Sequence, residues 1–180
     1  KNPSGRLTMT MPRHLGQVPI YYNHMNTGRP VEEGAKQYSK YRSNYLDVRN
    51  DPLYPFGYGL HYGYAPIYES FSLRVKGDIS KVNPSASILL INYGDHAIDE
   101  VVQLYIRDVS AHIVRPVKEL KGFSRVHLEP GEKRTVSFTI TKDMLSHYDE
   151  NGNKVFDPGE YEVMIGPNSR DVHGKRITIK

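Results

Sequence analysis

From Phe71 onward, apolar and polar residues alternate in short runs, which is the pattern of half-buried β-strands. Each run places its apolar side chains on one face of a strand. The alternating sets are Phe71, Leu73 and Val75; Val102, Leu104 and Ile106; Val136, Phe138 and Ile140; Tyr161, Val163 and Ile165; and Ile177 and Ile179. This periodicity predicts a mainly β structure for residues 69–180.

Two stretches depart from simple alternation. Ile88–Ile91 is a continuous apolar run, which predicts a strand that is covered on both faces. Within Lys118–Leu128 the alternation of apolar positions slips between Leu120 and Val126, and Gly122 lies between them. A β-bulge or a sheet-switching bend at this glycine would explain the slip.

Residues that favour turns separate the predicted strands. Four such segments are Asn92-Tyr93-Gly94-Asp95, Glu129-Pro130-Gly131-Glu132, Glu150-Asn151-Gly152-Asn153 and Asp157-Pro158-Gly159-Glu160. About seven short strands over about 110 residues, with a turn every dozen or so, is typical of a two-sheet sandwich. The absence of Trp and Cys excludes an antibody-type Cys–Trp–Cys core and leaves a fibronectin-like variant open.

Residues 1–68 have a different character. Turn signals crowd together there, and 7 of the 12 prolines lie in this segment. Two short stretches, Leu7–Met11 and Val18–Tyr22, are candidate strands, and no amphipathic helix accompanies them. Such a stretch cannot bury a core alone. We therefore expect it to be the tail of a larger domain, packed against protein that is absent from this chain.

Composition bounds the class of protein. With 38% hydrophobic and 24% charged residues among 180, the chain has a globular profile. It contains no run of 18 apolar residues, so we expect no membrane span, and its first residues show no secretion signal. It has no cysteine, which excludes disulfides and thiolate metal sites.

The net charge of +4 is unevenly distributed. Residues 1–68 contain 8 Lys and Arg against 4 Asp and Glu, and 10 of the 14 tyrosines; residues 69–180 contain 16 of each charge. A basic, Tyr-rich stretch could bind nucleic acid through phosphate contacts and stacking. The charges follow no periodic face, however, and we favour a polar surface segment with packed tyrosines and no nucleic-acid partner.

Candidate catalytic groups are few. Glycoside hydrolysis needs two carboxyl groups that flank the scissile bond, and the loop-rich third offers only Glu32, Glu33, Asp47 and Asp51. Their polar neighbourhoods give no reason for one pKa to differ from another. Ser4 is not in a nucleophile elbow, and no glycine pair opens a phosphate-binding helix. We assign no catalytic residue and expect no cofactor.

The eight histidines raise the question of a metal site. No two of them have His-x-x-x-His spacing, and we predict no metal site. His24 and His61 stand alone among tyrosines, and we expect them to be hydrogen-bonded packing residues. The alternative for both is contact with a ligand or a neighbouring domain.

Several motifs resemble the bacterial β-glucosidase type of family 3 glycoside hydrolases, nearly from end to end. Asn2–Leu7, Met11–Arg13 and Gly16–His24 are similar to the last strands of that family's α/β sandwich domain, Asn26–Pro30 to the following loop, and Leu53–Leu60 to the entry into the third domain. Glu100–Asp108, Arg115–Phe123 and Leu128–Glu132 are similar to its fibronectin type III-like domain. His61-Tyr62-Gly63 and Asn92-Tyr93-Gly94 depart from the usual family residues, in positions that leave the fold unchanged.

The resemblance implies a fibronectin type III-like (immunoglobulin-like) β-sandwich over residues 69–180. Residues 1–68 would then be the tail of the α/β sandwich domain plus a linker. The partners would be the remainder of the hydrolase, its barrel and α/β domains, and a β-glycoside substrate bound by the whole enzyme. The family's catalytic Asp and its acid/base Glu precede the matched segments, so neither is carried over.

Two functions follow as hypotheses. In the first, the chain is the structural carboxy-terminal part of a retaining, exo-acting β-glucosidase, periplasmic or secreted, in which Asn23, His24 and Arg29 border the substrate cleft. An interdomain ion pair is the alternative role for Arg29. In the second, the chain is a stand-alone module that binds carbohydrate or protein, since tyrosine rings stack well on sugar faces.

Overall fold

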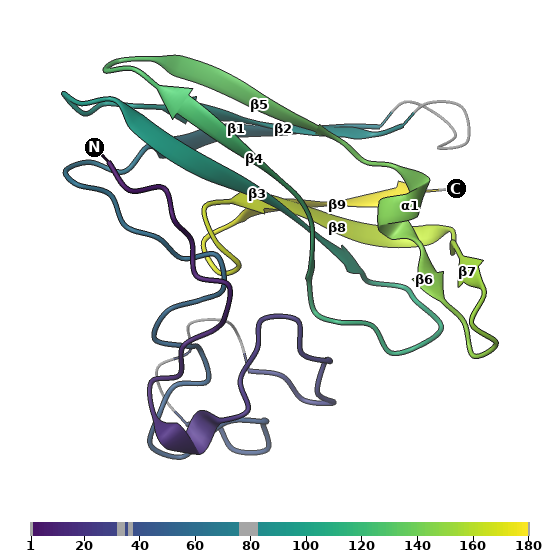
Figure 1. The fold of residues 1–180 in the computed structure, drawn as a ribbon. Coiled ribbons are helices and arrows are strands. Elements are labelled where there is room, and N and C mark those ends of the chain that lie inside the picture. The colour runs from purple at the N-terminus through teal and green to yellow at the C-terminus, as the bar shows by residue number, and fades with distance from the viewer. Residues whose placement is uncertain (1, 32–34, 36–37, 76–82, 180) are drawn as a thin grey trace.

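The computed structural model describes residues 2–31, 35, 38–75 and 83–179. Two antiparallel sheets pack face to face in layers (Figure 1). One sheet has the order β1-β2-β5, formed by Ile67–Arg74, Ser85–Ile91 and Lys133–Thr139. The other has the order β4-β3-β8-β9, formed by Glu119–Leu128, Ile98–Asp108, Gly159–Gly166 and His173–Ile179.

Three short elements complete the described structure. The 3-10 helix η1 (Leu15–Gln17) lies in the loop-rich amino-terminal segment. The one-turn helix α1 (Lys142–Leu145) leads into a small hairpin of β6 (His147–Tyr148) and β7 (Lys154–Val155). Among the described residues, no helix is long and apolar enough to cross a membrane.

The hydrophobic core lies between the two sheets and confirms the alternating pattern. Its fully buried members include Ile88, Leu90, Val102, Leu104, Val136, Val163 and Ile165. Phe71 and Leu73 pack against this cluster from β1. Val75 follows the end of β1 and is 40% exposed, so its predicted place in the alternation is wrong. Prolines aside, the buried apolar residues in the described part of the chain number 18, and all of them lie between Ala86 and Ile179.

The bulge predicted in β4 is present. Leu104 pairs with Gly122 and Tyr105 pairs with Leu120, so the register of β3 against β4 shifts by one residue at Lys121. Leu120 therefore lies opposite Tyr105 on the outer face, whereas Val126 packs against the core. Because of the extra residue, two side chains an even number of positions apart point to opposite faces of β4.

The prediction that the Ile88–Ile91 strand is covered on both faces is wrong for Leu89. Burial in β2 alternates, and Leu89 is only partly buried on the outer face. A strand that is covered on both faces is β3, in which every residue from Val102 to Ile106 is buried. The loop-rich segment lies against the outer face of β3, and this contact between distant parts of the chain supplies the second cover.

Three of the four predicted turns connect strands, and Gly131 and Gly152 in two of them adopt a positive φ (74° and 79°). The predicted turn at Asp157–Glu160 does not form. β8 begins at Gly159, which pairs with Ile179 of β9. Sheet pairing there overrides the local preference of Pro-Gly for a turn.

The predicted strands at Leu7–Met11 and Val18–Tyr22 do not form either. Met11 makes an isolated bridge with Tyr54, and Leu7 exchanges backbone hydrogen bonds with Gly57 and Tyr58. A bend separates these two contacts, so no continuous ladder develops. Residues 2–31 and 38–66 are otherwise irregular and follow the side of the β4-β3-β8-β9 sheet in Figure 1.

Candidate functional site

A buried ion network joins the loop-rich segment to the sandwich. Glu100 of β3, whose side chain is 1% exposed, accepts hydrogen bonds from Arg6 at 2.5 Å and His61 at 2.9 Å. Arg6 Nη2 also lies 3.3 Å from His61 Nε2. The Tyr68 hydroxyl is buried close to the same carboxylate. The network confirms that His61 is a hydrogen-bonded packing residue, as the sequence predicted.

Electrostatics keep the Glu100 carboxylate charged. Burial by itself would raise the pKa of Glu100, but hydrogen bonds and charge from His61 and Arg6 outweigh burial and hold the pKa below its ordinary value. Burial, and then the Glu100 charge, raise the pKa of the Tyr68 phenol, which therefore stays protonated. Because its carboxylate is engaged by two partners, Glu100 serves as an anchor between the two parts of the chain.

A second contact seals the outer face of β3. Gln103 donates to the carbonyl oxygens of Gly57 at 3.0 Å and Pro167 at 2.6 Å, and it accepts from the Tyr105 hydroxyl at 2.5 Å. The Tyr22 ring stacks on Phe56 with 4.3 Å between centroids. These polar and aromatic contacts hold residues 22 and 56–57 against the sheet.

The structure places the three predicted substrate-binding residues on one exposed loop. Asn23, His24 and Arg29 are all exposed. His24 lines a hollow of about 670 Å³ between this loop and the outer face of β8 and β9; other lining residues include Ile20, Asn26, Thr27, Lys118, Glu162 and Met164. Asn23 and Arg29 are outside that lining. The His24 carbonyl accepts from the Val117 amide at 2.9 Å, which fixes the loop to the sandwich.

The candidate acids of the loop-rich third lie in different surroundings. Asp51 forms ion pairs with two arginines. Its Oδ2 lies 3.0 Å from Arg13 Nη2, and its Oδ1 lies 2.6 Å from Arg49 Nε. Burial favours a higher pKa for Asp51, yet the hydrogen bonds and charges of these two guanidinium groups lower it overall. Asp47 is exposed, and Glu32 and Glu33 lie outside the described residues. Asp51 is thus a structural ion-pair partner with both oxygens engaged.

A third cluster brings together groups that are distant in the sequence. His112, His147 and Asp157 place one potential ligand atom each within 4.8 Å of one another. Sequence reasoning missed this cluster because it searched for closely spaced histidines. His112 follows β3, His147 starts β6 and Asp157 precedes β8, so only the folded sheets reveal their proximity.

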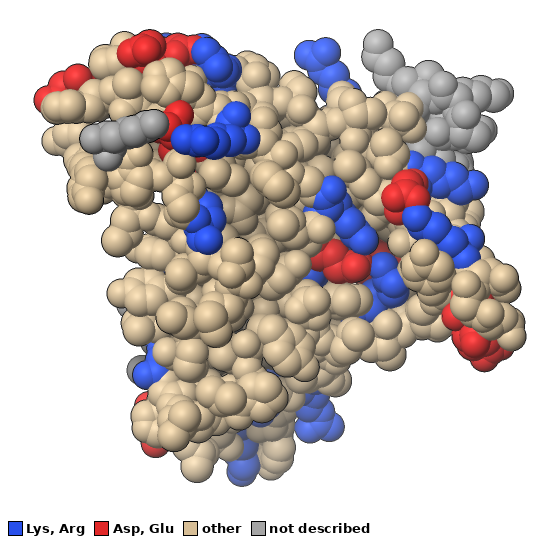
Figure 2. Space-filling view, viewed as in Figure 1, with Lys and Arg blue, Asp and Glu red and all other residues tan. Residues whose placement is uncertain are grey.

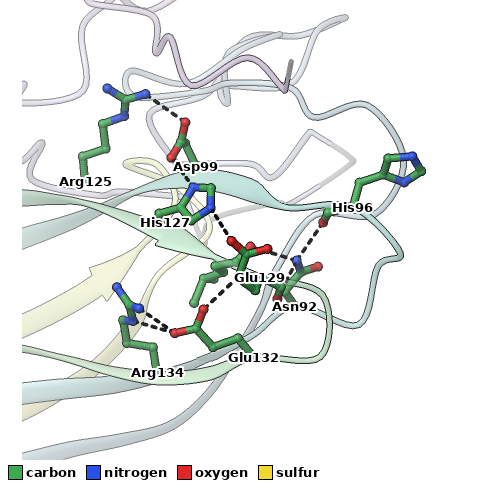
Figure 3. A network of polar contacts seen from close by, with 9 residues as sticks. Asn92, His96, Asp99, Arg125, His127, Glu129, Glu132 and Arg134 are labelled. Carbon is green, nitrogen blue, oxygen red and sulfur yellow. Dashed lines mark hydrogen bonds and ion pairs between the residues drawn. The ribbon is translucent and has the colours of Figure 1, made fainter.

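A surface network spans the connections from β2 to β3 and from β4 to β5, which join the two sheets (Figure 3). His127 contacts Asp99 at 2.9 Å through Nδ1 and Glu129 at 3.2 Å through Nε2. Nearby, Asn92 donates to the backbone oxygens of His96 and Leu128. On the face in Figure 2, charged side chains are scattered, and most of the surface is uncharged.

Comparison with known proteins defines the class of the sandwich. Residues 100–169 match the model of the fibronectin type III-like domain family. The whole chain is 41% identical over 175 residues to a periplasmic β-glucosidase of Salmonella typhimurium, which covers 95% of this chain and 22% of that protein. It is also 41% identical over 182 residues to a putative β-xylosidase of Formosa agariphila, with 99% and 22% covered.

Solved structures agree with the similarity to β-glucosidases. The β-glucosidase of Listeria innocua in complex with isofagomine superposes with a TM-score of 0.87 at 41% identity, over 99% of this chain and 25% of that one. The chain therefore aligns with the carboxy-terminal region of β-glucosidases of the family 3 type, including a fibronectin type III-like domain. It spans about a fifth to a quarter of the length of the relatives it matches.

Proposed function

We propose that this chain is the structural carboxy-terminal part of an exo-acting, retaining β-glucosidase whose nucleophile and acid/base reside in the preceding barrel and α/β domains. The observation that carries the proposal is the distribution of apolar surface. Of the 22 exposed large apolar and aromatic side chains in the described structure, 16 lie between Met9 and Ile67. None of the 18 buried apolar core residues lies in that segment.

Such an unburied apolar set indicates a surface that packs against more protein. Leu15 is 82% exposed, Leu46 is 78% exposed and Leu60 is 66% exposed. The relatives supply an occupant for this surface, because about three quarters of their length has no counterpart here. We assign residues 1–68 to the tail of the α/β domain plus a linker, and residues 69–180 to the sandwich that supports them.

The anchors described above give the sandwich its role in this proposal. Arg6 and His61 bind Glu100, while Tyr22 stacks on Phe56 beside Tyr105. These contacts hold the loop-rich segment against a rigid sheet. A segment held in this way can present a fixed surface to the catalytic domains, and precise placement matters because small displacements are costly in catalysis.

Within this proposal, Asn23, His24 and Arg29 border the substrate cleft. Their exposure supports the idea, as does the backbone hydrogen bond that joins His24 to Val117 of the sandwich. In the complete enzyme, alanine at each position would raise KM for an aryl β-glucoside or lower kcat. Unchanged kinetics in all three variants would remove these residues from the cleft.

The proposal is tested by hydrolysis of an aryl β-glucoside. We expect no activity from the chain alone, none or little from the upstream domains alone, and activity on mixing the two. A Glu100→Gln chain, which weakens the internal anchor, should restore less activity than a chain with the partly exposed control Glu132→Gln. Clear activity of the purified chain alone would contradict the proposal.

The exposed tyrosines support a second candidate, a carbohydrate-binding module. Tyr41, Tyr62 and Tyr64 are each at least 70% exposed, and aromatic rings of this kind stack on sugars. Calorimetric titration of the chain with soluble β-glucans separates the two hypotheses. Binding that is lost on alanine substitution at Tyr62 or Tyr64 would favour the module, whereas the structural role predicts no binding by the chain alone.

A further inference from the structure

Three segments of the sandwich converge at one end of the sheets, beside the β6–β7 hairpin. His112 belongs to the connection between β3 and β4, which lies next to this hairpin in Figure 1. His147 is the first residue of β6, and Asp157 lies between β7 and β8. The site therefore joins a loop, a hairpin and a strand entry, none of which is part of the ion network around Glu100.

The geometry of the three side chains is convergent. His112 Nδ1 lies 2.8 Å from Asp157 Oδ2, and His147 Nε2 lies 3.6 Å from the same oxygen. The two imidazole rings meet edge to face, with 5.8 Å between centroids and 62° between planes. Each residue offers one ligand atom, and all three atoms fall within 4.8 Å of one another.

The buried members of the cluster have unmet bonding capacity. The His147 side chain is 0% exposed, and neither of its ring nitrogens has a hydrogen-bond partner among the described residues. Asp157 Oδ2 is also buried without a well-formed hydrogen bond. An imidazole left unpaired in the interior is costly. A bound ion that contacts His147 and Asp157 would satisfy both groups.

We propose that His112, His147 and Asp157 form a binding site for a divalent transition metal, with Zn²⁺ as the expected ion. Two imidazole nitrogens and one carboxylate oxygen are a usual ligand set for Zn²⁺. His112 is 64% exposed, so the fourth position opens to water, and this side chain has room to adjust to tetrahedral geometry. The ion links the β3–β4 connection to the β6–β7 hairpin.

The surroundings fit a cation. Asp108, at the end of β3, has a buried oxygen that receives no hydrogen bond from the part of the chain that the structure describes. Burial raises the pKa of this carboxyl, and the charge of Asp157 raises it further, against the opposing charge of Arg115. A dication beside Asp157 would offset the repulsion between the two acids. The Tyr161 hydroxyl donates to the Asp157 carbonyl at 2.5 Å and so fixes the backbone of this ligand.

The test uses the full chain without a polyhistidine tag, stripped of metal with a chelator. Calorimetric titration with Zn²⁺ should show one site, and Zn²⁺ should raise the melting temperature, because a ligand that binds only the native state stabilises it. Ca²⁺ and Mg²⁺, which prefer all-oxygen ligands, should do neither. Co²⁺ should give the visible absorption of a tetrahedral complex.

Variants locate the site. His112→Ala removes an exposed ligand and should weaken Zn²⁺ binding by more than about tenfold. Loss of a residue that only supports a ligand already lowers metal affinity by about that factor, and loss of the ligand itself should lower it further. Asp157→Asn should act in the same direction. His127→Ala is the matched control, since His127 contacts two carboxylates through opposite ring nitrogens that cannot face one ion.

The melting temperature of each metal-free variant shows whether it is folded. Absence of stoichiometric Zn²⁺ binding by the wild-type chain would overturn the proposal. So would a His112→Ala variant that is folded and binds Zn²⁺ as tightly as the wild type, or a His127→Ala variant that loses binding to the same extent as His112→Ala.

Discussion

Glu100 and Arg6 form a buried ion pair at 2.5 Å although they are 94 positions apart in the sequence. The pair ties the start of the irregular segment to the central strand of the larger sheet. Removal of one partner from a buried pair leaves the other charge uncompensated, and this costs more than the pair itself contributes. The pair is therefore a sensitive probe of how the two parts of the chain depend on each other.

Glu100→Gln should lower the free energy of unfolding by about 3–5 kcal/mol, the usual cost of breaking a buried ion pair. Arg6, 10% exposed, would lose its counter-charge. Urea denaturation measures the change. Glu132→Gln is the control, because Glu132 pairs with Arg134 on the surface (Figure 3). This substitution should leave the midpoint of urea denaturation unchanged. Equal midpoints for wild type and Glu100→Gln would show that the pair does not stabilise the fold.

The stability of the chain should fall in acid through the same group. The folded pKa of Glu100 is below its ordinary value of 4.5. Its contribution is therefore complete above pH 4.5 and is lost as the pH falls through the lower folded pKa. The gap in unfolding free energy between wild type and Glu100→Gln should narrow over that range. A constant gap from pH 7 down to pH 3 would contradict this assignment.

Gly57→Ala should destabilise the chain more than Gly63→Ala does. Both glycines have a positive φ (80° and 82°), but a Cβ at Gly57 would lie 2.0 Å from Gln103 Oε1, whereas nothing lies within 4 Å at Gly63. Gln103 cannot easily withdraw, because three hydrogen bonds hold its amide. We expect about 1–2 kcal/mol for the backbone conformation alone and about 1–3 kcal/mol more for the clash at Gly57.

Thermal or urea unfolding of the two alanine variants measures that difference. Similar losses of stability would mean that Gln103 moves aside without cost.

Leu104→Ala and Leu15→Ala should differ in their effect on the stability of this chain. Leu104 is fully buried in the core, and its truncation should cost about 2–5 kcal/mol in the free energy of unfolding. Leu15 is 82% exposed, and its truncation should leave that free energy unchanged. In the complete enzyme, Leu15→Ala should become destabilising, which scanning calorimetry of both proteins would detect. No effect in either protein would argue against a covered surface at Leu15.

Local patterns in the sequence determined most of the sandwich. The period of two placed Val102 and Leu104 on the core face, and the interrupted alternation around Gly122 located the bulge in β4. These signals are local, because side chains alternate along any strand and a bulge shifts that alternation by one residue. Motifs spread along the chain likewise indicated the β-glucosidases to which the comparisons find it similar.

Only the tertiary structure decided which groups meet across the chain. The outer face of β3 is buried because Tyr22 and Gly57 lie against it, and the Leu7–Met11 strand fails to form because its only backbone contacts are separated by a bend. His112 and His147 converge from different connections. Alternation along a strand specifies which side chains share a face, whereas sheet packing and loop placement determine what covers that face and which distant polar groups come into contact.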